Sequence, residues 1–163
     1  MPAAEPVPSR PLWLVVWGAL TAAPVIYSAL APQLARPEPA EIFPTMRAVL
    51  VAVAAACFAL GAFVMSRAGR PGGWPPAPPG TASAGDLAAP QVFQLRSIVA
   101  MALFECSSVF GFVLVGLGMS ALEILPWAAA TVVGMLAIVL PNGLAYWRRW
   151  EMEGAGSGGL RTR

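Results

Sequence analysis

One ionisable side chain, Glu105, lies inside a long apolar stretch of the sequence. The stretch runs from Ser97 to Leu122, 26 residues, and Glu105 is its only charged residue. About 20 apolar residues are enough for a helix to cross the hydrocarbon core of a bilayer. The stretch therefore predicts a membrane span with a carboxyl group inside it. Such a group costs about 3 kcal/mol to insert at the centre of a span, so Glu105 is the first candidate functional residue.

The sequence offers Glu105 no basic partner at its own depth. Arg96 is roughly 13 Å away along a helix axis, and no other basic residue lies within a predicted span. An unpaired carboxyl group in hydrocarbon is expected to keep its proton at neutral pH, which makes it a hydrogen-bond donor and a proton carrier. Three roles stay open: a bond that holds the bundle in register, proton binding, and proton-coupled transport by a dimer. The candidate hydrogen-bond partners include Thr21, Ser28, Thr131 and Asn142.

The remaining residue types give no support for catalysis or for a metal site. The chain has no histidine, the commonest metal ligand and general base. It has no Gly-rich phosphate loop, no catalytic-triad composition and no basic face for nucleic acid. We therefore expect no enzymatic activity, no cofactor and no nucleic-acid partner. Cys57 and Cys106 each lie 10 residues from a flanking arginine, which predicts similar depths on neighbouring spans. A disulfide or metal pair is then geometrically allowed, and apolar filling is the simpler role.

Composition places the whole chain in a membrane. Of the 163 residues, 58% are hydrophobic and 11% are charged, whereas a soluble domain carries about 25% charged residues. The predicted fold class is all-α, an integral membrane four-helix bundle. We expect spans at 12–31, 48–66, 97–120 and 124–147. The other segments are a disordered lead at 1–11, an external loop at 32–47, a flexible Pro/Gly-rich loop at 67–96 and a tail at 148–163.

The arginines predict how the bundle is oriented. Four spans put both ends of the chain and the loop 67–96 on one side, together with eight of the ten arginines. The positive-inside rule then places that side in the cytoplasm, which indicates a bacterial-type inner (plasma) membrane.

Small residues predict where the helices pack, because they let helix backbones approach closely in lipid. The predicted packing residues are Ala52, Ala56 and Ala59 on the second span, and Ser107, Gly111 and Gly118 on the third. Prolines and glycine predict irregular helix geometry at Pro24 in the first span and at Pro141-Asn142-Gly143 in the fourth.

Aromatic and basic residues at span ends predict anchors at the membrane surface. Trp13 and Trp17 begin the first span. The collar that ends the fourth span consists of Trp147, Arg148, Arg149 and Trp150.

The residues around Glu105 resemble one known family. Ala102-Leu103-Phe104-Glu105, then Phe110-Gly111-Phe112-Val113, resembles the ion-binding helix of the rotary ATP synthase proteolipid, subunit c. That helix often carries a carboxylate followed five, six and eight residues on by an aromatic residue, a glycine and a valine. The resemblance implies that Glu105 binds the proton and that the preceding Ala-rich span is the inner helix of a hairpin. It covers about a dozen residues, and the loop before the helix is about 30 residues long here, where the family has a short polar loop.

From these observations we predict an accessory or interaction subunit of the inner membrane, with Glu105 as a structural or proton-binding residue. Its surroundings are the lipid bilayer, and its partner is a second copy or another membrane protein. The alternative is a proton-translocating subunit similar to subunit c, or a small proton-coupled transporter.

Overall fold

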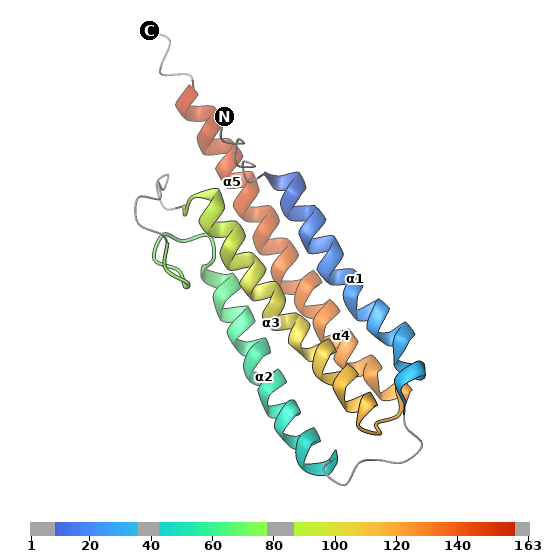
Figure 1. Cartoon of the computed structure of the whole chain (residues 1–163). Coiled ribbons are helices and arrows are strands. Elements are labelled where there is room, and N and C mark those ends of the chain that lie inside the picture. The colour runs from blue at the N-terminus through green and yellow to red at the C-terminus, as the bar shows by residue number, and fades with distance from the viewer. Residues whose placement is uncertain (1–8, 36–42, 78–86, 159–163) are drawn as a thin grey trace, which may run out of the picture.

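The computed structural model describes residues 9–35, 43–77 and 87–158. Within these residues, four long helical segments lie side by side (Figure 1), and each is long and apolar enough to cross a membrane. The predicted fold class is confirmed: the protein is an all-α, multi-pass membrane protein. The start of the first helix and the end of the last lie at the same end of the bundle (Figure 1), and this end is called the terminal end below.

The first helix, α1, spans Arg10–Leu34 and starts at a local cap. The Ser9 side chain accepts a hydrogen bond from the Leu12 amide at 3.5 Å, and Pro11 occupies the first turn, where its missing N–H is harmless. Pro24 and Pro32 both lie inside α1, so the helix continues past the predicted boundary at residue 31. Residues 1–8 of the predicted lead and 36–42 of the external loop are outside the described residues.

The second and third helices, α2 (Phe43–Arg67) and α3 (Pro90–Gly116), are antiparallel neighbours. They approach closely at Gly61, where an added Cβ would lie 3.2 Å from the Ala100 carbonyl oxygen and 3.3 Å from Leu103 Cβ. Helix α3 ends in a turn at Gly118, whose φ of 110° favours glycine. A short 3₁₀ helix follows at Ala121–Ile124 and leads into the fourth span.

The fourth span is one continuous helix with an irregular turn inside it. It consists of α4 (Leu125–Gly134), a π-helical turn (Met135–Val139) and α5 (Leu140–Gly158). In the π turn, the Leu140 amide bonds the Met135 carbonyl, five residues earlier. Pro141 has no N–H and its ring would clash with the carbonyl four residues before it. The irregular helix geometry predicted at Pro141 is therefore present, as the π turn that precedes the proline.

The aromatic residues at the terminal end point into the bundle. Trp13 and Trp147 are buried, and the Trp13 Nε1–H donates to Ser97 Oγ at 2.9 Å. The interpretation of Trp13 and Trp147 as lipid-facing anchors is wrong, because both indoles fill the space where α1, α3 and α5 meet. Trp17 is half-buried and donates to the Met135 carbonyl at 3.3 Å.

The remaining residues of the predicted collar are less buried. Trp150 is half-buried, and Arg148 and Arg149 are exposed. The two arginines are therefore the collar residues that are free to reach the surroundings of the bundle. The predicted tail at 148–163 continues as helix to Gly158, and residues 159–163 lie outside the described part.

Candidate functional site

Glu105 lies near the middle of α3 and is buried, with 8% of its surface exposed. Neither carboxyl oxygen has a hydrogen-bond partner among the described residues. Buried polar groups in native proteins nearly always have partners, and an exception calls for an explanation. The indole N–H of Trp147 is also buried without a partner among the described residues, but of the two groups only the Glu105 carboxyl is ionisable.

None of the four candidate partners named from the sequence forms a hydrogen bond with Glu105. Three of the four candidate partners bond a carbonyl of their own helix instead, one turn earlier. Short polar side chains readily adopt this local alternative, which the sequence interpretation did not weigh. The three bonds are Thr21 to the Trp17 carbonyl (2.7 Å), Ser28 to the Pro24 carbonyl (2.8 Å) and Asn142 to the Ile138 carbonyl (2.8 Å).

The fourth candidate, Thr131, joins α3 to α4 one turn away from Glu105. The Ser108 hydroxyl donates to Thr131 Oγ1 at 2.7 Å, and Thr131 Oγ1 donates to the Phe104 carbonyl at 2.9 Å. Both side chains are completely buried. The register-holding role considered for Glu105 thus belongs to the Ser108–Thr131 pair, which leaves the acid free for another role.

The surroundings of Glu105 include α1 as well as its own helix. The Tyr27 hydroxyl on α1 faces the carboxyl group and is close enough for a long, weak interaction, but the pair falls short of a well-formed hydrogen bond. The Tyr27 ring packs against Phe112, with 5.4 Å between the ring centroids. Tyr27 is the nearby hydroxyl that the sequence interpretation missed, because nothing in the sequence says which face of α1 meets α3.

The two cysteines lie beside each other at this level. The Cys57 thiol on α2 faces the Cys106 thiol on α3, and both thiols are free. The similar depth predicted from their spacing is therefore present. Among the described residues there is no group of three or more side chains that could hold a metal ion, and packing is the role that the contacts of the two thiols support.

The predicted packing residues of α3 occupy two kinds of position. Gly111 is a packing residue, since an added Cβ would lie 2.7 Å from Trp127 Cβ. Ser107 is buried as well. Gly118 lies beyond the end of α3, in the turn with positive φ, so its role is to end the helix.

The predicted packing residues of α2 face outward. Ala52, Ala56 and Ala59 are exposed, so they do not pack against another described helix of this chain, and their role as packing residues stays a prediction. The buried face of α2 is instead formed by Ala54, Gly61, Val64 and Met65, and Ala68, just beyond the end of the helix, is buried as well. A helix so rich in alanine looks alike on both sides, and the sequence alone does not distinguish them. An apolar groove of about 470 Å³ lies beside the outward face, between α2, α3 and α4.

Arg96, at the start of α3, is completely buried and organises the loop that follows α2. Its guanidinium donates to five backbone carbonyls, which matches its five N–H groups. The acceptors are Pro75 (2.8 Å), Ala68 (3.3 Å), Arg70, Pro71 (3.3 Å) and Gly73 (2.6 Å). Among the described residues no carboxylate forms an ion pair with Arg96.

The loop 67–96 was predicted to be flexible, and its described part is instead held by Arg96. Gly73 is needed there, because an added Cβ would clash with the Arg67 carbonyl and lie 2.8 Å from Arg96 Nη1. The two ends of the loop are also joined, since the Ala88 amide donates to the Gly69 carbonyl at 2.9 Å. Residues 78–86 are outside the described part.

Comparison with family models, with curated proteins and with solved structures finds no match to this chain. The resemblance of the Glu105 segment to subunit c therefore stays a prediction.

Proposed function

We propose that the protein is an accessory or interaction subunit of a membrane assembly. In this assembly, a partner binds the Glu105 carboxyl group. The observation that carries this proposal is the buried carboxyl group with two unsatisfied oxygens. A buried polar group without a hydrogen bond costs about 1–3 kcal/mol. A partner that supplied the missing bonds would recover that free energy, so the unsatisfied group favours binding.

The outward face of α2 supports an interaction role. Ala52, Ala56 and Ala59 are exposed, and small residues at this spacing let a second helix approach closely in lipid. The adjacent groove is lined mostly by apolar residues, including Ala55, Phe58 and Trp127. The partner is a transmembrane helix, contributed either by another membrane protein or by a second copy.

The arginines of the described chain support a cytoplasmic position for the terminal end. Arg67, Arg70, Arg96, Arg148 and Arg149 belong to the segments at this end. At the opposite end, Arg47 is the one arginine among the described residues. By the positive-inside rule, the terminal end faces the cytoplasm of a bacterial-type inner membrane.

The experiment that tests the interaction role is labelling with a hydrophobic carbodiimide, which attacks protonated carboxyl groups that are reachable from the membrane. Labelling is read at Glu105 by mass spectrometry, in native membranes and in the purified chain in nanodiscs. We expect protection of Glu105 in native membranes and labelling of the purified chain at one copy per nanodisc, because neither another protein nor a second copy is then present. Glu105→Gln is the control that defines background.

Proton exchange is the alternative function, and the unsatisfied carboxyl group favours it too. In that case Glu105 would be labelled in both settings, and labelling would fall as the pH rises. A closed ring of many copies would then indicate a rotor subunit, and a dimer with substrate-dependent proton release would indicate a transporter. If Glu105 were labelled in neither setting at any pH, the carboxyl group would be satisfied within the chain and both functions would be rejected.

A further inference from the structure

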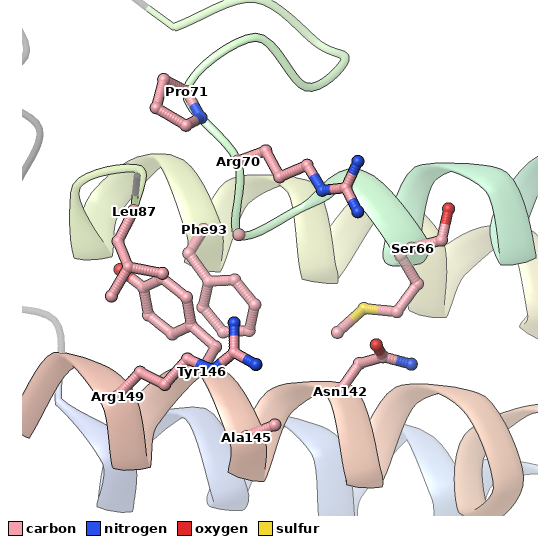
Figure 2. Close-up of a pocket in the computed structure, with 11 residues that line it drawn as sticks. Ser66, Arg70, Pro71, Leu87, Phe93, Asn142, Ala145, Tyr146 and Arg149 are labelled. Carbon is pink, nitrogen blue, oxygen red and sulfur yellow. The ribbon is translucent and has the colours of Figure 1, made fainter. Parts of the chain in front are cut away.

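A second polar site, independent of Glu105, lies at the terminal end of the bundle. It is a pocket of about 490 Å³ between the end of α2, the loop after it, the start of α3 and α5. Figure 2 shows its two arginines on opposite walls, Arg70 on the loop and Arg149 on α5. Both arginines are exposed, so the pocket is open to a ligand from outside the chain.

The pocket is positively charged. Neither Arg70 nor Arg149 forms an ion pair with a described residue, and no acidic residue is among those that line the pocket. Glu153 lies near the Tyr146 hydroxyl but does not line the pocket. A third positive charge stands behind the wall, since the Arg96 guanidinium donates to the Arg70 and Pro71 carbonyls. Two guanidinium groups facing one space are a usual means of binding a phosphate or carboxylate.

The walls of the pocket are fixed by contacts that span the sequence. The Tyr146 hydroxyl on α5 donates to the Ala88 carbonyl at 2.7 Å, and the Tyr146 ring stacks on Phe93 with 3.7 Å between centroids. On the loop side, the carbonyls around Arg70 are held by Arg96. The two arginines therefore stand on a preorganised frame, which reduces the entropy lost when a ligand binds.

The position of the pocket indicates which anion it meets. It lies where the apolar part of α2 ends at Arg67, close to the exposed Arg148, and this is the headgroup level of a spanning protein. Apolar side chains on its floor, among them Met65 and Phe93, suit the carbon skeleton of a ligand. Basic pockets between spans on the cytoplasmic side are suited to lipid headgroups. We propose that this pocket binds the phosphate group of an anionic phospholipid.

The test counts lipids that stay bound to the protein. The full chain is taken from nanodiscs of equal phosphatidylglycerol and phosphatidylcholine, and retained lipid is identified by native mass spectrometry. The pocket variant is Arg70→Gln/Arg149→Gln. Its control, Arg67→Gln/Arg148→Gln, removes the same charge from exposed residues that do not line the pocket. A third variant, Ala145→Trp, fills the pocket without changing any charge.

We expect the parent and the control to retain one phosphatidylglycerol in preference to phosphatidylcholine. The pocket variant should bind it at least about ten-fold more weakly, since each arginine contributes charge-assisted hydrogen bonds. Ala145→Trp should lose it as well, and it keeps the test decisive if the double variant does not fold. Equal retention of the two lipids, or an equal loss in the control, would overturn the proposal. Displacement of the lipid by inorganic phosphate would show that the pocket takes the free anion instead.

Discussion

Two ionisable side chains, Arg96 and Glu105, are buried on α3, nine residues apart, and they differ in their hydrogen bonds. All five N–H groups of Arg96 meet backbone carbonyls, whereas both oxygens of Glu105 meet none among the described residues. A buried charge that is fully satisfied within its own chain supports the fold. A buried polar group left unsatisfied is a cost to the fold, and its presence indicates a function outside the isolated chain.

The largest effect is expected at Arg96. Arg96→Met removes all five donors and leaves the loop carbonyls without partners, so we expect a loss of about 3 kcal/mol or more in the free energy of unfolding. Proteolysis of the segment 68–77 should become faster as well. Arg96→Lys should restore little of this loss, because an ammonium group offers three donors and no planar fork.

The matched control for this prediction is Arg67→Met. Arg67 is exposed and lies over the Phe63 ring at 4.6 Å, so its replacement should change stability by about 0.5 kcal/mol or less. Stability is measured by denaturation in mixed micelles. If Arg96→Met and Arg67→Met are equally stable, the hydrogen bonds of Arg96 do not stabilise the fold.

An intermediate effect is expected at Thr131. Thr131→Val deletes the hydroxyl that accepts from Ser108 and donates to the Phe104 carbonyl. We expect a loss of about 1 kcal/mol in the same denaturation measurement, since the remaining groups stay buried. Thr21→Val is the control, because the Thr21 hydroxyl bonds only its own helix. If the two variants lose the same free energy, the Ser108–Thr131 pair does not hold α3 to α4.

The smallest effect on folding is expected at Glu105 itself. Glu105→Gln should change the free energy of unfolding by less than about 0.5 kcal/mol, and Glu105→Leu should raise it by about 1 kcal/mol, because an unsatisfied polar group is removed. Glu105→Leu should nevertheless lose both assembly and proton exchange, whereas Glu105→Gln should lose proton exchange alone, because its amide can still form hydrogen bonds with a partner. A destabilised Glu105→Leu would mean that the acid has a partner within the chain, and the contrast with Arg96 would disappear.

Much of the architecture could be predicted from the sequence, because hydropathy reports directly on spans. The four helices, the adjacency of Cys57 and Cys106 and the intramembrane position of Glu105 all follow from runs of apolar residues and their lengths. What hydropathy does not report is the direction in which a residue faces. The inward position of Trp13 and Trp147 and the outward position of Ala52, Ala56 and Ala59 therefore could not be read from the sequence.

The role of Arg96 could not be predicted for a different reason. Its acceptors are backbone carbonyls, which every residue carries, so no side-chain pattern marks them. The high content of proline and glycine in the loop indicated flexibility. The same residues leave carbonyls free of helix bonding, and these carbonyls are what the guanidinium binds. A single buried arginine next to such a segment is the one signal that could have pointed to an ordered loop.

The π turn at Met135–Val139 has a geometric consequence for everything that follows it. A π turn takes up one more residue than an α-helical turn, so it acts as a one-residue insertion accommodated inside a helix. Each added residue rotates the following part of the helix by about 100°. The π turn thus changes the direction in which residues of α5 face relative to residues of α4. Thr131 lies before the turn and Arg149 lies after it. Shortening the turn by one residue would leave Thr131 facing α3 and swing Arg149 out of the pocket.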